Sequence, residues 1–474
     1  MSNTIQQGYS PAQLTRIRQI FNGEDIFKST SEAEPDGLKD VIIVGGEGDL
    51  MKGVDPGDLT RELSAKGVQV EESLDRFGVT ARVSQDKLAD LKEDGYLVYD
   101  NSPRPLVPGI PRSGSVRSLV GDPDYSMPKV EPTPWLKADQ LHQQGITGKG
   151  QVVAVLDSGY DHPQHPPLAW KDVVNGNQKP VDMVGHGTHV AGDVLQTAPD
   201  AQIVAVKVMG DDGTGRPSDI IRGLQWVINE KKAGRLDVDV INMSLGGPPD
   251  GFPDKLDPVN RTVEAAVRAG ITVVAAAGNS GPEGHTIGSP ADSGASIAVG
   301  ATLNPTTVSQ FSSRGPTDDG LIKPDVMAPG EFISSWSVPG SEMEQTGQVV
   351  ERLRAMSGEE LKAVLRDKPH LIDALGLPPD ILKRPSQEVE DLVKPNLPGV
   401  YLPGPGLIAA PGTSFASPLV AGVVAALEQE KDLSPVETRE VLRGSADSMG
   451  QFSGNEQGAG FVNAEKALNR IRQA

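Results

Sequence analysis

From Pro134 onward, the chain alternates short, almost uninterrupted apolar runs with segments of helical character. The runs are rich in Val, Ile and Ala. Strands of this composition have both faces buried, which is typical of a parallel sheet covered by helices on both sides. We therefore expect a doubly wound, mostly parallel α/β fold. The expected strands are Val152–Leu156, Ile203–Val208, Val238–Met243 and Ile271–Ala277.

Polar residues follow three of these runs. Asp157, Ser244 and Asn279 stand at or just after the carboxyl ends of the expected strands. In open α/β sheets the binding and reactive groups gather at that edge. Asp157 alone also suits the nucleophile of a strand–Asp phosphatase, but Gly159 occupies the position where a second aspartate is expected.

A helix that is apolar on every side is expected from the segment Gly412–Leu427, which carries no charge. Ser414 would begin this buried helix, among backbone N–H groups that lack partners within the helix. The hydroxyl there can be a simple N-cap. It can also attack a carbonyl while the helix end stabilises the oxyanion.

Two histidines, His186 and His189, open another segment of small and apolar residues. A metalloprotease helix would place the second histidine four positions on, with a glutamate beside the first, and neither condition is met. Together with Asp157 and Ser414, His186 makes an Asp…His…Ser set. His186 would take the proton of Ser414 and return it to a leaving amine. Asp157 would hold the imidazole tautomer, and Asn279 would donate its amide to the oxyanion.

The sequence resembles the subtilisin-like serine proteases. Four motifs carry the resemblance, VLDSGYD around Asp157, GHGTHVAG around His186, AAAGNSG around Asn279 and GTSFASP around Ser414. The resemblance implies that substrate binds as an added strand and that an apolar or aromatic P1 side chain is preferred, because no charged residue matches the floor of the first pocket. The substrate-binding residues that it implies are Gly213, Thr214, Gly215, Ser244, Leu245, Gly246, Ala276, Ala277, Gly278 and, at the pocket floor, Gly288.

The chain divides into four parts. Residues 1–37 are expected to form an N-terminal arm with a short helix, and residues 38–103 a small α+β domain of βαββαβ order. That domain resembles, more weakly, the family's propeptide, which implies an intramolecular inhibitor. Residues 104–130 are expected to form a linker with the processing site, and residues 131–474 the catalytic domain. A dinucleotide-binding loop after the first strand is rejected because its third glycine is missing.

An insertion at residues 340–406 separates the last motif from the rest of the resemblance. Ser357 and Glu360 in it form a capping box, and apolar residues follow at helical spacing. The insertion is either a surface decoration with its own small core or a lid over the substrate cleft, since both of its ends would lie near Ser414.

Composition bounds the partners. A net charge of −20 argues against nucleic acid and anionic membranes, and the absence of cysteine excludes disulfides and thiolate metal sites. No membrane span or secretory signal is visible, so we expect a cytoplasmic protein or export by another route. Catalysis would need no cofactor. A structural calcium ion is uncertain because the segment Asp193–Thr197 is short where many family members have a calcium loop. Asp325, Asp211 and Asp212 are either ligands or solvated carboxylates.

The favoured hypothesis is a serine endopeptidase made as a self-processing zymogen, with proteins or peptides as substrates. A non-catalytic binding protein on the same scaffold is the alternative from another class. An esterase that uses the same triad is a third hypothesis.

Overall fold

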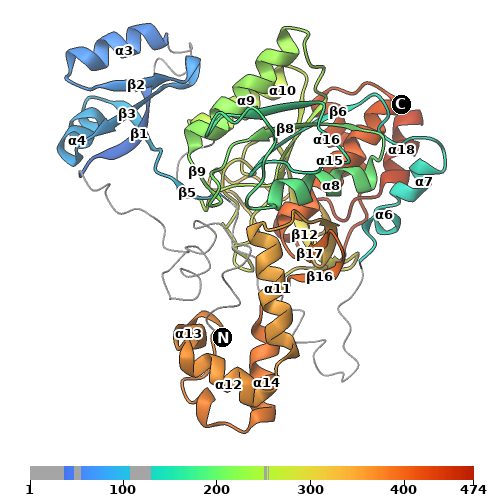
Figure 1. Ribbon diagram of the computed structural model, residues 1–474. Coiled ribbons are helices and arrows are strands. Elements are labelled where there is room, and N and C mark those ends of the chain that lie inside the picture. The colour runs from blue at the N-terminus through green and yellow to red at the C-terminus, as the bar shows by residue number, and fades with distance from the viewer. Residues whose placement is uncertain (1–36, 47–54, 107–129, 250–253, 255, 474) are drawn as a thin grey trace.

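The computed structural model describes residues 37–46, 55–106, 130–249, 254 and 256–473. Its main body is built on an eight-stranded sheet with the order β13-β12-β11-β10-β6-β8-β7, in which β14 also pairs with β12 (Figure 1). All pairings are parallel except that of β12 with β13. The strands are β6 (Val152–Asp157), β7 (Ala169–Asp172), β8 (Gln202–Lys207), β10 (Val240–Met243), β11 (Thr272–Ala276), β12 (Ile297–Asn304), β13 (Thr307–Val308) and β14 (Val326–Pro329).

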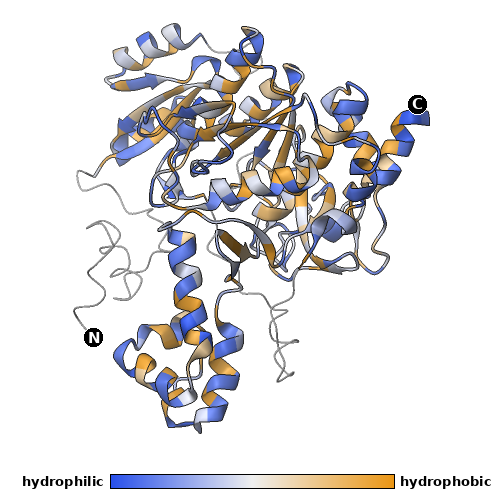
Figure 2. Cartoon of the chain, turned by 45° about the vertical axis from the view of Figure 1, so that its right-hand side comes forward, coloured by the Kyte–Doolittle hydropathy of each residue, from blue (hydrophilic) through white to orange (hydrophobic). Residues whose placement is uncertain are grey.

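Helices cover both faces of this sheet, as the buried strand sequences predicted. Alternate residues of β6 point to opposite sides. Val153 and Val155 pack in one core with α8 (His186–Thr197) and α15 (Thr413–Glu430). Ala154 and Leu156 pack in a second core with α9 (Pro217–Lys232) and α10 (Pro258–Arg268). The doubly wound, mostly parallel α/β architecture is thereby confirmed. Figure 2 shows the central strands as a continuous hydrophobic layer beneath more hydrophilic outer helix surfaces.

Five shorter helices complete the body around α15, and none of them contributes a predicted site residue. They are α6 (Pro132–Trp135), α7 (Ala138–His142), α16 (Pro435–Ser445), α17 (Gly454–Gln457) and α18 (Ala464–Gln473). Among the described residues, no helix has the length and apolar content needed to cross a bilayer.

A separate four-stranded antiparallel sheet, in the order β2-β3-β1-β4, lies at the N-terminal end. Its elements are β1 (Lys39–Gly46), α3 (Pro56–Ala65), β2 (Val70–Ser73), β3 (Val79–Val83), α4 (Gln85–Glu93) and β4 (Tyr96–Asp100). This is the βαββαβ order expected from the sequence. The strand expected from Arg76 begins only at Val79, because Asp75–Phe77 form a turn of 3₁₀-helix. One face packs on α3 and α4, and the other contributes Ile42, Leu74 and Phe77 to the core of α9 and α10. The helix expected near Ser10 lies outside the described residues.

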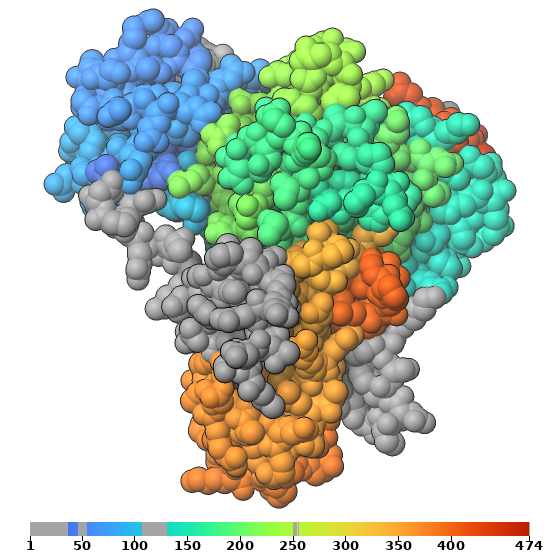
Figure 3. Space-filling view, in the orientation of Figure 1, coloured from blue at the N-terminus to red at the C-terminus, as the bar shows by residue number. Residues whose placement is uncertain are grey.

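The insertion forms a helical lobe that protrudes from the body (Figures 1 and 3). It contains α11 (Glu342–Ala355), α12 (Gly358–Asp367), α13 (His370–Ala374) and α14 (Ser386–Val393). The capping box of Ser357 and Glu360 is present at the start of α12. A three-stranded antiparallel sheet joins the lobe to the body. Its strands are β15 (Ile333–Trp336), β16 (Tyr401–Gly404) and β17 (Leu407–Ala410).

Candidate active site

Asp157 and His186 meet at the carboxyl edge of the main sheet. Asp157 is the last residue of β6, and His186 is the first of α8. The Nδ1 of His186 lies 2.7 Å from Oδ1 of Asp157, and both side chains are buried. The N–H of Ser158 donates to the same carboxylate oxygen at 2.7 Å. This arrangement places the Nδ1 proton on the Asp157 side, which leaves Nε2 as the nitrogen able to accept a proton.

The start of α8 is organised by a second buried carboxylate, that of Asp182. Its Oδ1 accepts the hydroxyl of Ser158 at 2.8 Å and the N–H of Gly185 at 2.8 Å. Its Oδ2 accepts the N–H and the hydroxyl of Thr188, at 2.9 and 2.7 Å. These four hydrogen bonds to one carboxylate connect Ser158, which follows Asp157, to Gly185 and Thr188, which lie on either side of His186. Asp182 therefore fixes the two segments that carry the Asp157–His186 pair.

Ser414 is the second residue of α15, a helix whose residues from Thr413 to Leu427 are all buried. Its hydroxyl donates to the backbone carbonyl of Ser244 at 3.2 Å. The ring of the next residue, Phe415, lies 5.4 Å from the imidazole of His186, centroid to centroid. The Nε2 of His186 is buried and forms no hydrogen bond with the described side chains or backbone. The helix start that carries Ser414 thus adjoins an imidazole with an unused acceptor.

A proline inside α15 explains a further contact at this point. Pro418 has no N–H, so the carbonyl of Ser414, four residues before it, lacks its usual partner within the helix. The hydroxyl of Ser244 donates to that carbonyl at 2.6 Å. The amide of Asn242 donates in turn to the Ser244 hydroxyl at 2.9 Å, and Ser417 lies 3.0 Å from it. The residue after β10 is thereby fixed to the first turn of α15.

Asn279 is oriented by the residue that begins α15. Its Oδ1 accepts the N–H and the hydroxyl of Thr413, at 3.0 and 2.9 Å. Because an N–H can only donate, the oxygen of the Asn279 amide must face Thr413, and the NH₂ group faces away from it. The hydroxyl of Thr413 also accepts the N–H of Gly278 at 3.1 Å. The amide donor of Asn279 and the N-terminal turn of α15 consequently lie side by side.

Two of the predicted substrate-binding segments hold a piece of the chain itself. A short strand, β5 (Arg104–Pro105), pairs antiparallel with β9 (Thr214–Gly215). The N–H of Leu106 donates to Gly213 at 3.3 Å, and its carbonyl accepts the N–H of Gly246 at 3.1 Å. The side chain of Leu106 is buried in the core of α9 and α10. The part predicted as linker thus starts with residues that lie between the segments Gly213–Gly215 and Ser244–Gly246.

The remaining predicted substrate-binding residues follow β11 and the next loop. Ala276 and Ala277 are buried, and Gly278 has a φ of +108°. A Cβ at Gly288 would lie 2.2 Å from the carbonyl oxygen of Gly247, so a side chain cannot fit there. Gly288 therefore packs against Gly247 and Pro248, which follow the Ser244–Gly246 segment.

The charges around His186 favour its protonated form. Burial alone would lower the pKa of His186, but the charge of Asp157 and the hydrogen bond to it outweigh that effect. Asp182 and Asp193 add to the same influence, and the pKa of His186 is raised above its ordinary value. An imidazolium at this position is consequently stabilised by its surroundings.

Both ring nitrogens of His189 have partners within the protein. Its Nδ1 lies 2.9 Å from the carboxylate of Asp193, and its Nε2 lies 3.2 and 3.1 Å from the carbonyls of Ile333 and Ile408. Both ring nitrogens are therefore used, one by a carboxylate of its own helix and the other by the strands β15 and β17. Over the described part of the chain, no group of three His, Asp or Glu side chains is placed to hold a metal ion.

The three aspartates considered for calcium have other partners. Asp325 is fully buried, which corrects the expectation of a solvated carboxylate. It accepts from Lys323 at 2.7 Å and from Arg439 and Arg443, so three cationic side chains surround its carboxylate. Burial opposes ionisation, yet the charges of Lys323 and Arg439 hold the pKa of Asp325 below its usual range. Asp211 pairs with Lys207 at 3.1 Å, and Asp212 accepts the N–H of Thr214 at 3.0 Å.

Sequence reasoning missed Asp182, Thr413 and Leu106. Asp182 stands between Val181 and Met183, just before the histidine motif, and its apolar neighbours are the only hint in the sequence that it is buried. Thr413 lies within the GTSFASP motif, and its hydroxyl, next to Ser414 in the sequence, is the signal that could have predicted its role. Apart from its two prolines, the stretch Asn101–Leu106 has Leu106 as its one apolar residue, and that is a weak signal.

Similarity to known proteins identifies the family of the chain. The model of the subtilase family matches residues 148–461. Serine protease AprX of Bacillus subtilis (strain 168) is 35% identical over 350 residues, which cover 69% of this chain and 67% of that protein. Subtilisin E of the same strain is 35% identical over 293 residues, 59% of this chain and 68% of that protein. Subtilisin of Bacillus pumilus is 41% identical over 219 residues, 43% of this chain and 73% of that protein. On these matches the chain belongs to the subtilase family and is a subtilisin-like serine protease.

Proposed function

We propose that the chain is an endopeptidase in which Ser414, His186 and Asp157 act as nucleophile, general base and orienting acid. The observation that carries this proposal is the buried Asp157–His186 pair, 2.7 Å apart, beside the helix start that presents Ser414. Rotation of the Ser414 side chain away from the carbonyl of Ser244 would bring its hydroxyl toward the unused Nε2 of His186. The serine then attacks the scissile carbonyl and gives up its proton to the imidazole.

The oxyanion formed in that step would be stabilised by two donors. One is the backbone N–H of Ser414 at the start of α15, where N–H groups have no partner within the helix. The other is the NH₂ group of Asn279, which is turned away from Thr413. The intermediate then collapses to an acyl-enzyme as the peptide C–N bond breaks and His186 returns its proton to the leaving amine. Water, deprotonated by His186 in the same way, finally hydrolyses the acyl-enzyme and frees Ser414. The buried, small residues Ala276 and Ala277 support an apolar or aromatic P1 preference.

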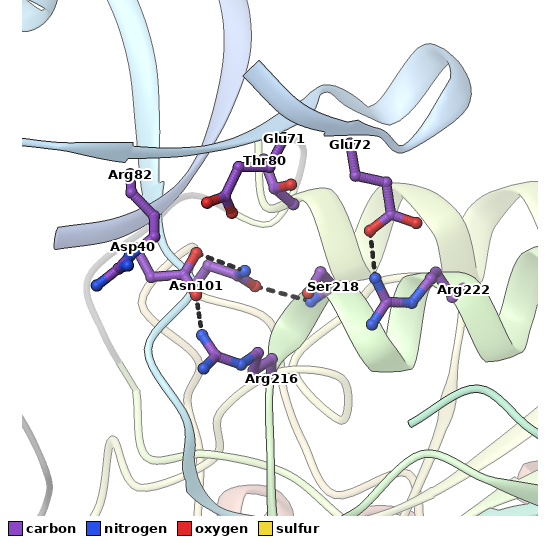
Figure 4. A pocket seen from close by; sticks show the side chains of 9 residues that line it. All are labelled: Asp40, Glu71, Glu72, Thr80, Arg82, Asn101, Arg216, Ser218 and Arg222. Carbon is purple, nitrogen blue, oxygen red and sulfur yellow. Dashed lines mark hydrogen bonds and ion pairs between the residues drawn. The ribbon is translucent and has the colours of Figure 1, made fainter. Parts of the chain in front are cut away.

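The N-terminal sheet is proposed to be an inhibitory propeptide. Leu106 and β5 occupy the groove in which substrate would bind as a strand. Charged contacts hold the rest of the sheet against α9 (Figure 4): Arg216 pairs with Asp40 and Arg222 with Glu72. Asn101 accepts a backbone N–H from the first turn of α9 at 2.9 Å and so caps that helix from the neighbouring domain. Cleavage within the following residues, up to 130, would release this inhibitor.

The test compares purified wild type with Ser414→Ala by intact-mass measurement and fluorophosphonate labelling. We expect wild type to be labelled at Ser414 and to shorten itself, whereas Ser414→Ala stays full length and unlabelled. Ser445→Ala, which removes a buried serine of α16, is the matched control and should behave as wild type. Wild type that takes no label would reject the triad. Labelled wild type that stays full length and cleaves peptide would reject the propeptide alone.

A further inference from the structure

The insertion contacts the loop that precedes His186. The N–H of Glu342 donates to the carbonyl of Met183 at 2.9 Å, and the N–H of Met343 donates to that of Val184 at 3.0 Å. Glu342 and Met343 are the first two residues of α11, whose N–H groups have no partner inside the helix. The loop carbonyls therefore cap the helix, and the helix fixes the two peptide groups that lead toward His186.

Gly185, between this loop and His186, is packed tightly against α11. Its φ is +86°, and a Cβ built on it would lie 2.5 Å from the hydroxyl oxygen of Ser341 and 2.9 Å from its Cβ. Ser341 is the N-cap of α11 and accepts the N–H of Glu344 at 3.3 Å. Gly185 therefore has no room for a side chain on the face that packs against α11.

The helix that makes these contacts is itself anchored to the body. A Cβ at Gly347 would lie 3.2 Å from Leu402 and 3.4 Å from Ile408, so α11 packs closely on β16 and β17. The carboxylate of Glu351 accepts the N–H of Leu402 at 2.8 Å. Strand β17 then leads through Pro411 and Gly412 into α15, the helix that carries Ser414. One rigid helix consequently contacts the segment before His186 and the strand before Ser414.

We propose that the first turn of α11, Ser341 to Met343, positions His186 for proton transfer. Asp182 holds the same loop by accepting the N–H of Gly185, and α11 holds it by donating to its carbonyls. Both contacts restrict the peptide groups between Met183 and Gly185, which lead up to His186. A displacement of about 1 Å at a reacting group can cost about 10²-fold in rate. This inference rests on the proposed function, because the position of His186 matters to rate only if it is the general base.

The test removes one N–H and leaves α11 in place. Proline is favoured at the first position of a helix and lacks an N–H. Ser341 before it has a ψ of 162°, which suits a residue preceding proline. Glu342→Pro therefore deletes the hydrogen bond to Met183, and Glu342→Ala is the matched variant that keeps it. Both are assayed on a short peptide, with kcat expressed per fluorophosphonate-titrated site.

We expect kcat of Glu342→Pro to be about tenfold below that of Glu342→Ala, with KM within about twofold. Equal kcat values, with Ser414 labelled in both, would overturn the positioning role and leave the protease assignment intact. Absence of label in Glu342→Ala and wild type would instead overturn the assignment. If Glu342→Pro does not fold, Gly185→Ala is compared with Gly185→Ala/Ser341→Gly, in which the clash is relieved. Partial recovery of kcat per titrated site is expected in the double variant, and none would overturn the inference.

Discussion

The hydroxyl of Ser244 donates to the carbonyl of Ser414 at 2.6 Å, in place of the N–H that Pro418 lacks. A hydrogen bond therefore links the end of β10 to α15 at Ser414, the residue that is proposed to react. A proline four residues after Ser414 would otherwise leave a buried carbonyl without a partner, at a cost of about 1–3 kcal/mol.

Ser244→Ala is expected to lower both stability and kcat. The substitution leaves the Ser414 carbonyl without a donor, so the first turn of α15 loses its fixed position. We expect about a tenfold fall in kcat, with an unfolding free energy lower by about 1–3 kcal/mol. Ser417→Ala is the matched control, because it removes only a neighbouring hydroxyl 3.0 Å from that of Ser244. Equal kcat in the two variants would show that the bond to Ser414 has no catalytic consequence.

Asp182→Asn should impair catalysis without touching the triad. The carboxylate accepts four hydrogen bonds, and an amide presents an NH₂ group to donors that already face it. The segments that carry Asp157 and His186 should then separate. We expect kcat to fall about 10–100-fold with a smaller change in KM. Asp161→Asn is the comparison, since only the backbone N–H of Asp161 contacts Thr188. Steady-state kinetics on one peptide decide the outcome.

Asn279→Leu should lower kcat by about 10²–10³, with little change in KM, because the amide would act only on the developing oxyanion. Thr413→Val should have a smaller effect. It removes the hydroxyl that donates to Asn279 but keeps the backbone N–H that also orients the amide. A Leu variant with unchanged kcat would exclude Asn279 as an oxyanion donor. A Val variant as impaired as the Leu variant would show that Thr413 matters for another reason.

The acid limb of activity should lie at a higher pH than that of an ordinary histidine. The general base must be neutral, and the surrounding carboxylates raise the pKa of His186. We therefore expect kcat/KM to fall with decreasing pH around a midpoint above ~6.5. The measurement is a pH–rate profile on a peptide without titratable groups, with thermal unfolding followed at each pH. A midpoint below that value, in protein that remains folded, would contradict the arrangement.

Glu428→Gln should stabilise the protein at alkaline pH. Burial and the charge of Asp239 raise the pKa of Glu428 to about 8. The folded state therefore keeps a proton that the unfolded state releases near ~4.3, and stability falls as pH rises from there through the folded value. Glutamine has no such dependence. We expect the Tm of the variant to exceed that of wild type by more at about pH 9 than at about pH 5. Glu440→Gln, on an exposed side chain, should show no such trend.

The parts of the fold that the sequence predicted correctly depend on local pattern. Buried Val and Ile runs became β6, β8, β10 and β11, and Ser244 and Asn279 lie at their carboxyl ends as expected. Contacts between distant segments were not predictable in this way. Asp325, the residue before β14, is buried beside two arginines of a distant helix, α16. Strand β5 exists only because β9 offers it an edge.

The role of the insertion shows the same limit. Its capping box and apolar face could be predicted, because both depend on residues that are close together in the sequence. The contact of α11 with Met183 and Val184 joins segments that are far apart in the sequence. The spacing of apolar residues within either segment does not predict such a contact. The apolar face favours a decoration with its own small core, and the position of the two ends favours a lid. The lobe protrudes from the body, and the structural link found is to the loop before His186 (Figure 3).

The pairing of β5 with β9 has a consequence for how activity would begin. As part of the proposed inhibitor, Leu106 would compete with substrate at an effective concentration on the millimolar scale while it remains covalently joined to the body. Once the connection is cut, the same segment would compete only at its bulk concentration. Dilution alone would then vacate the groove, so activation should be slow in a concentrated solution and rapid in a dilute one.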